Sequence, residues 1–415
     1  MRTIIIVLLF SAKVLGQNHQ DFLVEYNLGS NARVSGLLSD SDSNLVVIGS
    51  EIDGNNFDVF LLKTSPDGSR IWDNIYGDIH SDRGLAILQS DLDGNYVAMG
   101  NQGLPDTLLG GESEFLVFKT DTNGNELWKT RWKKNNFCAI FEGTELSNGD
   151  LFLAGATGPF PARGADLEIA KLNASGVLQW SQTLSPIYFP NDLWVSPNDS
   201  IILLLGTDEG VPKRPFLMAF NSNGDSLWTR FYTELPNGNS GVRLLDSGDF
   251  FYLVATGPNS ERTFSTVHIT RIDRQGNILD SIVELPLQGK IEQQLAYDAI
   301  LNGDGTISLT GEGFYQRSGR TSVWSAHYNP ATGDLCIENI PGNNPFTSAV
   351  AIAAANDSTH FITGRLNNQV FIGRQSLYCP PVPEPPTPPT YENPIFPNPF
   401  TQTLHLEFRD LNTEA

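Results

Sequence analysis

The feature that most constrains the fold is an internal repeat that recurs seven times. Each copy has a turn rich in Asp, Asn and Gly, followed by an apolar segment that ends in glycine, as in residues 44–49 and 95–100. The closing glycines are Gly49, Gly100, Gly155, Gly206, Gly257, Gly311 and Gly364. A regular repeat of about 50 residues is typical of one supersecondary unit that stacks against copies of itself.

Each copy contains four short apolar segments separated by turns. After the closing glycine come a second strand, a tight turn at a further glycine and a third strand, and a fourth strand then leads into the next copy. Four short strands in about 50 residues are typical of a β-propeller blade. The sequence therefore predicts an all-β, seven-bladed propeller with four-stranded antiparallel blades, with six or eight blades as the alternatives.

A tryptophan stands four residues after the turn glycine in the better-preserved copies. We expect these side chains to pack between neighbouring blades, because their large rings fill the gap that widens toward the outside of a ring. They are Trp72, Trp128, Trp180 and Trp228.

The two ends of the repeat array complement one another. The seventh copy has its inner strands at 360–364 and 370–374 but lacks a turn followed by an outer strand. The missing piece resembles residues 23–29, which parallel residues 71–77 of the first copy. We therefore expect an N-terminal strand to complete the last blade and close the ring.

Charge and targeting exclude several partners. The chain has 26 Lys and Arg against 47 Asp and Glu, a net charge of −21, which argues against nucleic acid or an anionic membrane surface as a partner.

Residues 1–16 have a basic start and an apolar run at 4–10, which predicts a signal peptide cleaved before Gln17. No later apolar run reaches the roughly 18 residues of a membrane span. We expect a monomer that passes through the periplasm and is secreted or attached to the cell surface.

Three cysteines are present and none forms a CxxC pair, so a zinc site is not predicted. In an oxidising compartment Cys336 and Cys379 are candidates for a disulfide, and three separate buried thiols are the alternative. Because the number is odd, at least one thiol stays unpaired within the monomer.

The composition changes after the propeller, which is predicted at 17–379. Residues 380–393 form a proline-rich linker, and residues 394–415 contain Pro397, Asn398, Pro399 and Phe400 before alternating apolar positions at 404–408. This tail resembles the start of a C-terminal sorting domain of the type IX secretion system. The resemblance implies a small β-sandwich and export by that machinery. Only about twenty residues follow the linker, so we expect the sorting domain to be truncated here.

The repeat itself resembles known propellers. The stretch from Lys119 to Trp128 is similar to repeats of secreted bacterial propellers, and its Gly-to-Trp spacing resembles the tryptophan-docking motif of quinoprotein-like propellers. The resemblance implies the fold and not the function. Quinoprotein dehydrogenases use adjacent cysteines near their cofactor, and this chain has none.

No catalytic motif is present. The six histidines are scattered without an HExxH pair, and no GxSxG elbow occurs. We therefore predict no cofactor, with calcium at Asp91, Asp93 and Asp304 as an alternative to ordinary Asp/Gly turns. Three tryptophans outside the repeat position are candidates for a sugar or peptide groove, with packing between blades as the alternative: Trp132, Trp194 and Trp324.

These observations favour a binding or scaffold module for an extracellular glycan or protein. The alternative is a glycan-acting hydrolase or lyase with paired carboxylates at the channel mouth, and a third hypothesis is one module of a longer adhesin. Two acids about 5–10 Å apart beside exposed aromatic rings would favour the enzyme. Any site is expected at the channel mouth or on the variable loops after the closing glycines, which gather at one end of a propeller.

Overall fold

The computed structural model describes residues 22–29, 32–53, 56–103, 112–159, 165–184, 188–285, 293–315, 320–341, 347–355, 359–366 and 368–376. The chain divides into two units, Met1–Tyr378 and Cys379–Ala415. Every described residue belongs to the first unit. The predicted signal peptide, proline-rich linker and sorting segment lie outside the described residues.

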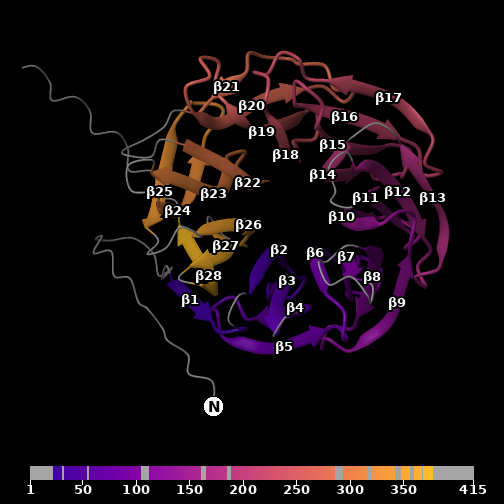
Figure 1. The fold of residues 1–415 in the computed structure, drawn as a ribbon. Coiled ribbons are helices and arrows are strands. Elements are labelled where there is room, and N and C mark those ends of the chain that lie inside the picture. The colour runs from indigo at the N-terminus through magenta and orange to yellow at the C-terminus, as the bar shows by residue number, and fades with distance from the viewer. Residues whose placement is uncertain are drawn as a thin grey trace, which may run out of the picture. The chain divides into compact units, whose positions relative to one another are not determined.

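Seven four-stranded antiparallel sheets form a closed ring, and the described residues contain no helix (Figure 1). The predicted all-β, seven-bladed architecture is therefore confirmed. The blades are numbered by their innermost strands, which face the centre of the ring in Figure 1. Within each blade the strand order in the sheet follows the order in the sequence, except in blade 7.

Blade 1 contains β2 (Arg33–Ser39), β3 (Leu45–Asp53), β4 (Asn56–Thr64) and β5 (Arg70–Tyr76). Blade 2 contains β6 (Asp82–Gln89), β7 (Tyr96–Gly103), β8 (Ser113–Thr120) and β9 (Glu126–Trp132). Blade 3 contains β10 (Phe137–Glu145), β11 (Leu151–Gly158), β12 (Asp166–Leu172) and β13 (Leu178–Leu184). Blade 4 contains β14 (Tyr188–Val195), β15 (Ile202–Asp208), β16 (Arg214–Phe220) and β17 (Ser226–Phe231).

Blade 5 contains β18 (Ser240–Asp246), β19 (Phe251–Pro258), β20 (Ser265–Ile272) and the short β21 (Val283–Glu284). Blade 6 contains β22 (Gln293–Leu301), β23 (Ile307–Tyr315), β24 (Arg320–Tyr328) and β25 (Leu335–Pro341). Blade 7 contains β26 (Ser348–Ala354), β27 (Thr359–Leu366), β28 (Gln369–Ser376) and β1 (Phe22–Tyr26).

The N-terminal strand closes the ring, as the sequence predicts. β1 pairs antiparallel with β28, and the order of blade 7 is β1-β28-β27-β26. The buried hydroxyl of Tyr26 donates a hydrogen bond of 2.6 Å to the carbonyl of Gly68 in blade 1. Val24, Tyr26 and Leu28 belong to one buried apolar cluster with residues of blade 1. The first strand therefore joins the last blade to the first.

The closing glycines allow the innermost strand to approach closely. In six of the seven blades the innermost strand has a β-bulge opposite this glycine, where one extra residue kinks the strand. In blade 5 the bulge lies opposite Ala255, two residues before Gly257. A Cβ atom on Gly49 would lie 2.1 Å from the carbonyl oxygen of Arg33, and one on Gly100 would lie 1.8 Å from that of Arg83. A Cβ atom at such a contact would force a shift of the innermost strand, which explains why glycine recurs at this position in six of the blades.

The repeat tryptophans face the turn glycine of the following blade. A Cβ atom on Gly176 would lie 2.5 Å from the ring of Trp128, and one on Gly224 would lie 2.5 Å from the ring of Trp180. The Trp72 ring lies against Gly124 and the Trp228 ring against Gly276 in the same way. These contacts link neighbouring blades at the outside of the ring.

Candidate functional site

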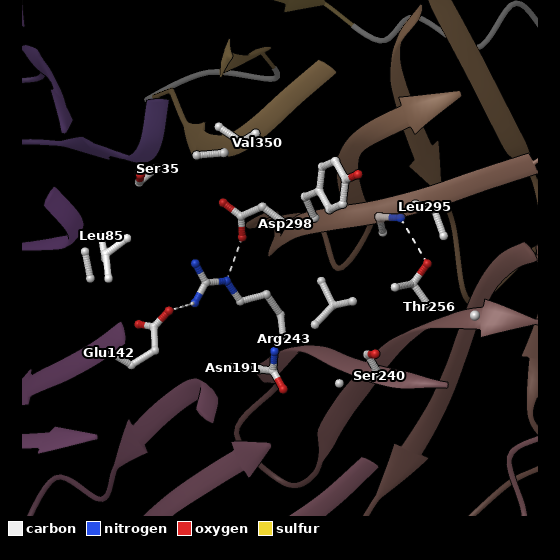
Figure 2. A pocket seen from close by; sticks show the side chains of 18 of the residues that line it. Ser35, Leu85, Glu142, Asn191, Ser240, Arg243, Thr256, Leu295, Asp298 and Val350 are labelled. Atoms are coloured by element: carbon white, nitrogen blue, oxygen red, sulfur yellow. Dashed lines mark hydrogen bonds and ion pairs between the residues drawn. The ribbon is translucent and has the colours of Figure 1, made fainter. Parts of the chain in front are cut away.

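A cavity of about 640 Å³ lies at the centre of the ring. Its walls come from the innermost strands of all seven blades, including Ser35, Leu85, Glu142, Asn191, Arg243, Asp298 and Val350 (Figure 2). A cavity of this size falls within the range of small-molecule sites. The ring therefore has a ligand-sized space where its seven sheets converge.

The bulges determine which side chains stand at corresponding places around this cavity. The residue that follows the bulged position is Gly36, Ala86, Glu142, Asp192, Arg243, Asp298 and Ala351 in blades 1 to 7. Four consecutive blades, 3 to 6, therefore carry charged residues, and the other three carry residues with little or no side chain. We call Glu142, Asp192, Arg243 and Asp298 the charged arc.

Arg243 lies at the centre of the charged arc. Its Nε donates to Oδ1 of Asp298 at 2.6 Å, and its Nη1 donates to Oδ1 of Asp192 at 2.9 Å. The same Nη1 lies 3.6 Å from Oε1 of Glu142. Burial disfavours the charge of Arg243, but the surrounding carboxylates outweigh this effect and raise its pKa well above the ordinary value. The guanidinium therefore stays charged.

The carboxylates of Asp192 and Asp298 are bound by other groups of the protein. Asp192 accepts a hydrogen bond of 2.7 Å from the backbone N–H of Leu244, and Asp298 accepts one of 2.9 Å from that of Ile352. Each contact reaches the innermost strand of the next blade. Because each carboxylate also binds Arg243, these two acids act as structural links between blades 4 and 5 and between blades 6 and 7.

Glu142 differs from the two aspartates. Among the described residues its carboxyl group has only the ion pair with Arg243 and no hydrogen bond, and 23% of its side chain remains exposed. Burial raises the pKa of Glu142 to about 8, despite the opposing effect of Arg243. The group therefore holds its proton to a higher pH than an ordinary glutamate does. It can both donate and accept a hydrogen bond from the cavity.

Glu142 and Asp192 are close neighbours. Both carboxyl groups contact the same Nη1 atom of Arg243, at 3.6 and 2.9 Å. Their contacting oxygens therefore lie within about 6.5 Å of each other, which is near the carboxyl separations of about 5–9.5 Å found in glycosidases. Burial also raises the pKa of Asp192. This upper bound on the separation is compatible with a pair of catalytic carboxyl groups, whereas the bonds of Asp192 to Arg243 and to the N–H of Leu244 do not favour that role.

An aromatic ring and apolar side chains complete the cavity. Tyr297 is the bulged residue of blade 6, lines the cavity and is 41% exposed. Its hydroxyl donates to Oε2 of Glu312 at 2.9 Å, which fixes the ring. Blades 1, 2 and 7 contribute Leu37, Leu85, Ile87 and Val350. The cavity therefore has one polar and charged side and one mainly apolar side.

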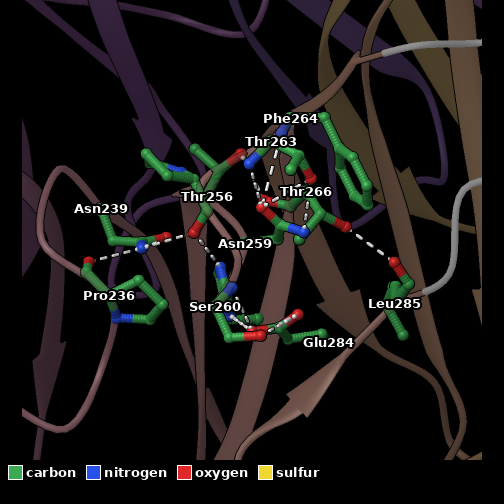
Figure 3. A network of polar contacts seen from close by, with 12 residues as sticks. Pro236, Asn239, Thr256, Asn259, Ser260, Thr263, Phe264, Thr266, Glu284 and Leu285 are labelled. Carbon is green, nitrogen blue, oxygen red and sulfur yellow. Dashed lines mark hydrogen bonds and ion pairs between the residues drawn. The ribbon is translucent and has the colours of Figure 1, made fainter.

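A polar network holds the wall of blade 5 in place (Figure 3). The buried Asn239 side chain donates to the carbonyls of Pro236 and Pro258 at 2.7 and 3.1 Å. Asn259 accepts from the backbone N–H of Thr263 at 2.8 Å, and the Thr256 hydroxyl accepts from the N–H of Ala296 in blade 6. Thr256 and Pro258 line the cavity, so this network stiffens one of its rims.

The three tryptophans predicted as ligand contacts lie away from this cavity. The Trp132 ring stacks on Phe115 at 4.8 Å, and the Trp194 ring packs edge-on against Phe251 at 4.9 Å. Trp324 has no exposed surface. The structure thus places all three in packing contacts, and none of them lines the cavity described above.

The calcium candidates take part in turns. Asp93 forms an ion pair of 2.7 Å with Lys119, Asp304 accepts from the N–H of Thr306 at 3.0 Å, and the N–H of Asp91 donates to Glu145. Within the described residues, no three His, Cys, Asp or Glu side chains are grouped to hold a metal ion. Calcium binding at these turns stays a prediction.

The structure bears on the predictions made for the cysteines and for a membrane span. Cys138 is a buried free thiol and Cys336 is disulfide-bonded, while its predicted partner Cys379 lies outside the described residues. In the part of the chain that the structure describes, no helix is long and apolar enough to cross a membrane.

The fold and the site define a seven-bladed β-propeller with a ligand-sized central cavity. No protein-family model and no curated protein matches the chain. Among solved structures it is similar to puromycin hydrolase, with 12% identity and a TM-score of 0.51 over 83% of this chain and 52% of that one. The phage phi92 endosialidase is 9% identical, with a TM-score of 0.50 over 94% and 76%. The propeller domain of the trilobed protease from Pyrococcus furiosus is 9% identical, with a TM-score of 0.49 over 84% and 96%. At these identities the likeness concerns the fold alone.

Proposed function

We propose that the protein is a ligand-binding module and that its ligand enters the central cavity. The observation that carries this proposal is the state of Glu142, whose carboxyl group faces a cavity of about 640 Å³ without a hydrogen bond from any described residue. A partly buried polar group without such a partner gains the most from a ligand that supplies one.

A carbohydrate fits this cavity best. Sugars offer hydroxyl groups that pair with a carboxyl group and apolar faces that stack on aromatic rings, and the cavity has Glu142 and the exposed ring of Tyr297. A peptide is the alternative ligand, because its amides offer similar hydrogen bonds.

A glycan and peptide array probed with the intact chain tests this proposal. Binders should lose affinity about ten-fold or more in Glu142→Ala and Tyr297→Ala, and Trp132→Ala should bind as the wild type does. An array without binders, or binders that both cavity variants retain in full, would count against it.

A second candidate function is glycan hydrolysis. It is favoured by the closeness of the Glu142 and Asp192 carboxyl groups and by the raised pKa of Glu142, because a general acid must hold its proton at the working pH. Assays on each array binder decide between the two functions. An enzyme loses turnover in Glu142→Gln, whereas a binding module shows no turnover in the wild type.

We also propose that the chain is exported to the cell surface or beyond by type IX secretion. The signal-like residues 1–16 and the motif Pro397-Asn398-Pro399-Phe400 support this proposal. Expression in a bacterium that has this system should yield extracellular protein that begins at Gln17. Deletion of residues 394–415 should retain it in the periplasm. An uncleaved cytoplasmic chain would contradict the proposal.

A further inference from the structure

Three arginines lie close in strand register to residues that line the central cavity, although none of the three is part of the lining. Arg33 and Arg83 hold the same position in blades 1 and 2, two residues before the bulged residues Ser35 and Leu85 that line the cavity. In blade 7 that position belongs to Ser348, and its cross-strand partner is Arg365. Blades 7, 1 and 2 therefore present cations next to the cavity, whereas blades 3 to 6 present the charged arc.

The side chains of two of these arginines converge. The guanidinium carbons of Arg33 and Arg83 lie 5.8 and 4.8 Å from the centroid of the Phe57 ring. A ring face attracts a cation, so Phe57 holds both groups at one place. Partial burial and the charge of Arg33 lower the pKa of Arg83 and also that of Arg365. The charge of Arg33 therefore acts on each of the other two arginines.

Neither Arg33 nor Arg83 has a carboxylate partner among the described residues, and both are exposed. This is unusual in a chain with 47 acidic residues and 26 basic ones. Many other basic side chains of the ring are paired, for example Lys63 with Asp40 and Arg214 with Asp208. Adjacent cations repel each other, and an anion between them would remove that cost.

The arginines also lie at the end of the ring where ligands are expected. Arg33 and Arg83 begin β2 and β6 and pair with Ser50 and Asn101, close to where the chain leaves β3 and β7 for the loops that follow the closing glycines. A ligand in the cavity reaches these side chains by extending toward this end.

We propose that Arg33 and Arg83 form an anion subsite, so that the ligand of this propeller is an acidic saccharide that carries a carboxylate or a sulfate group. The subsite binds the anionic group while the neutral part of the ligand lies in the cavity. Guanidinium groups suit this role because their planar donors match two oxygens of such an anion at once. The inference rests on the proposed ligand-binding function and adds the chemical class of the ligand to it.

Titration of the intact chain with three probes tests the inference. The probes are galacturonate oligomers, which carry carboxylates, sulfated dextran oligomers, and neutral dextran oligomers of the same length. The variant Arg33→Gln/Arg83→Gln removes both charges. The matched control is Arg230→Gln, which removes a charge on the outer strand β17 that is paired with Glu234. Thermal melts check that each variant is folded.

We expect at least one acidic probe to bind more tightly than neutral dextran and to lose about ten-fold or more of its affinity in the double variant. Arg230→Gln should keep the wild-type affinity. Preference for galacturonate identifies a carboxylate ligand, and preference for sulfated dextran identifies a sulfate ester. If the double variant does not fold, Arg83→Lys replaces it, since a lysine keeps the charge and loses the planar donors that a carboxylate needs.

The inference is overturned if no acidic probe binds better than neutral dextran, or if the double variant and Arg230→Gln lose affinity equally. Glu142→Ala separates this outcome from a failure of the cavity proposal. Acidic probes that bind Glu142→Ala normally but not the double variant support the anion subsite even where the cavity proposal fails. Acidic probes that bind the double variant normally but not the Glu142 variant support the cavity proposal and reject the anion subsite.

Discussion

The Nε atom of Arg243 lies 2.6 Å from Oδ1 of Asp298, across the junction of blades 5 and 6. The same guanidinium binds Asp192 of blade 4 and contacts Glu142 of blade 3. One side chain therefore holds four consecutive blades together at the inner edge of the ring. The charged arc thus has a structural role as well as a place in the candidate site.

Replacement of Arg243 by Met should destabilise the protein by about 3–5 kcal/mol near pH 7.5, because it leaves neighbouring buried carboxylates without their cation. Because methionine keeps much of the volume of the arginine stem, the loss of stability measures the effect of removing the charge. The deficit relative to the wild type should shrink as the pH falls and the carboxyl groups take up protons. Urea unfolding followed by tryptophan fluorescence at pH 7.5 and 5 measures both effects. A deficit that does not depend on pH would show that packing alone is lost.

Asp82 should make the wild type less stable as the pH rises. It is 2% exposed, and burial, followed by the charges of Asp78 and Asp58, raises its pKa to about 7 from an ordinary value of 3.8. The unfolded chain releases this proton near pH 4, whereas the folded chain keeps it until about pH 7. The free energy of unfolding therefore falls between these two values.

Asp82→Asn should remove this pH dependence. The variant should match the wild type near pH 4 and exceed it at pH 8 by up to about 4 kcal/mol, since one pKa unit corresponds to about 1.4 kcal/mol. Chemical denaturation across pH 4–8 measures the difference. The exposed Asp249→Asn serves as the control and should show no such trend. If the free energies of unfolding of Asp82→Asn and the wild type change in parallel with pH, the raised pKa of Asp82 is refuted.

The number and design of the blades were predictable from the sequence because they depend on local chemistry. Closing glycines such as Gly100 recur since the bulged strand leaves no room for a Cβ atom, and the turn glycines recur since their φ angles are positive. Closure by residues 23–29 was predictable because the missing strand has a recognisable copy at the other end of the array.

The site was not predicted, although its signal is present in the sequence. Glu142, Asp192, Arg243 and Asp298 each lie 13 or 14 residues before a closing glycine. Which of two adjacent residues faces the centre depends on the bulge, because one extra residue reverses the side to which the following side chains point. The bulge itself has no distinctive residue, since Phe141, Asn191, Val242 and Tyr297 all occupy it. Aligning the repeats on their closing glycines places these charged residues in two adjacent columns, so the alignment alone does not show that they share one position in the ring.

The contact between Trp128 and Gly176 should make that glycine unusually sensitive to substitution. Gly176 and Gly333 have nearly equal φ angles of +79° and +78°, so an alanine meets the same backbone strain of about 1–2 kcal/mol at either site. A Cβ atom on Gly176 would lie 2.5 Å from the Trp128 ring, whereas one on Gly333 would have no atom within 4 Å. Gly176→Ala should therefore lose about 1–3 kcal/mol more than Gly333→Ala. Equal losses in denaturant titrations would mean that the ring does not support the blade interface.

Closure by β1 should control the stability of the whole ring. Deletion of residues 17–30 removes the strand that pairs with β28 and the buried side chains of Val24, Tyr26 and Leu28. It leaves an unpaired edge on blade 7 and an exposed apolar surface on blade 1. Compared with a chain that lacks only residues 1–16, the deletion should lower Tm by more than about 10 °C, because each kcal/mol corresponds to about 2–4 °C or less in a domain of this size.

Tyr26→Phe tests the same closure without removing the strand. It deletes only the hydroxyl that donates to the Gly68 carbonyl at 2.6 Å, so it should cost about 1 kcal/mol. Phenylalanine keeps the ring in its buried position, which makes the hydroxyl the single variable. Differential scanning calorimetry on the three chains compares the effects directly. A deletion variant that melts within about 2 °C of the chain lacking residues 1–16 would mean that the other six blades close the ring without β1, because a lost strand pairing should shift Tm by more than that.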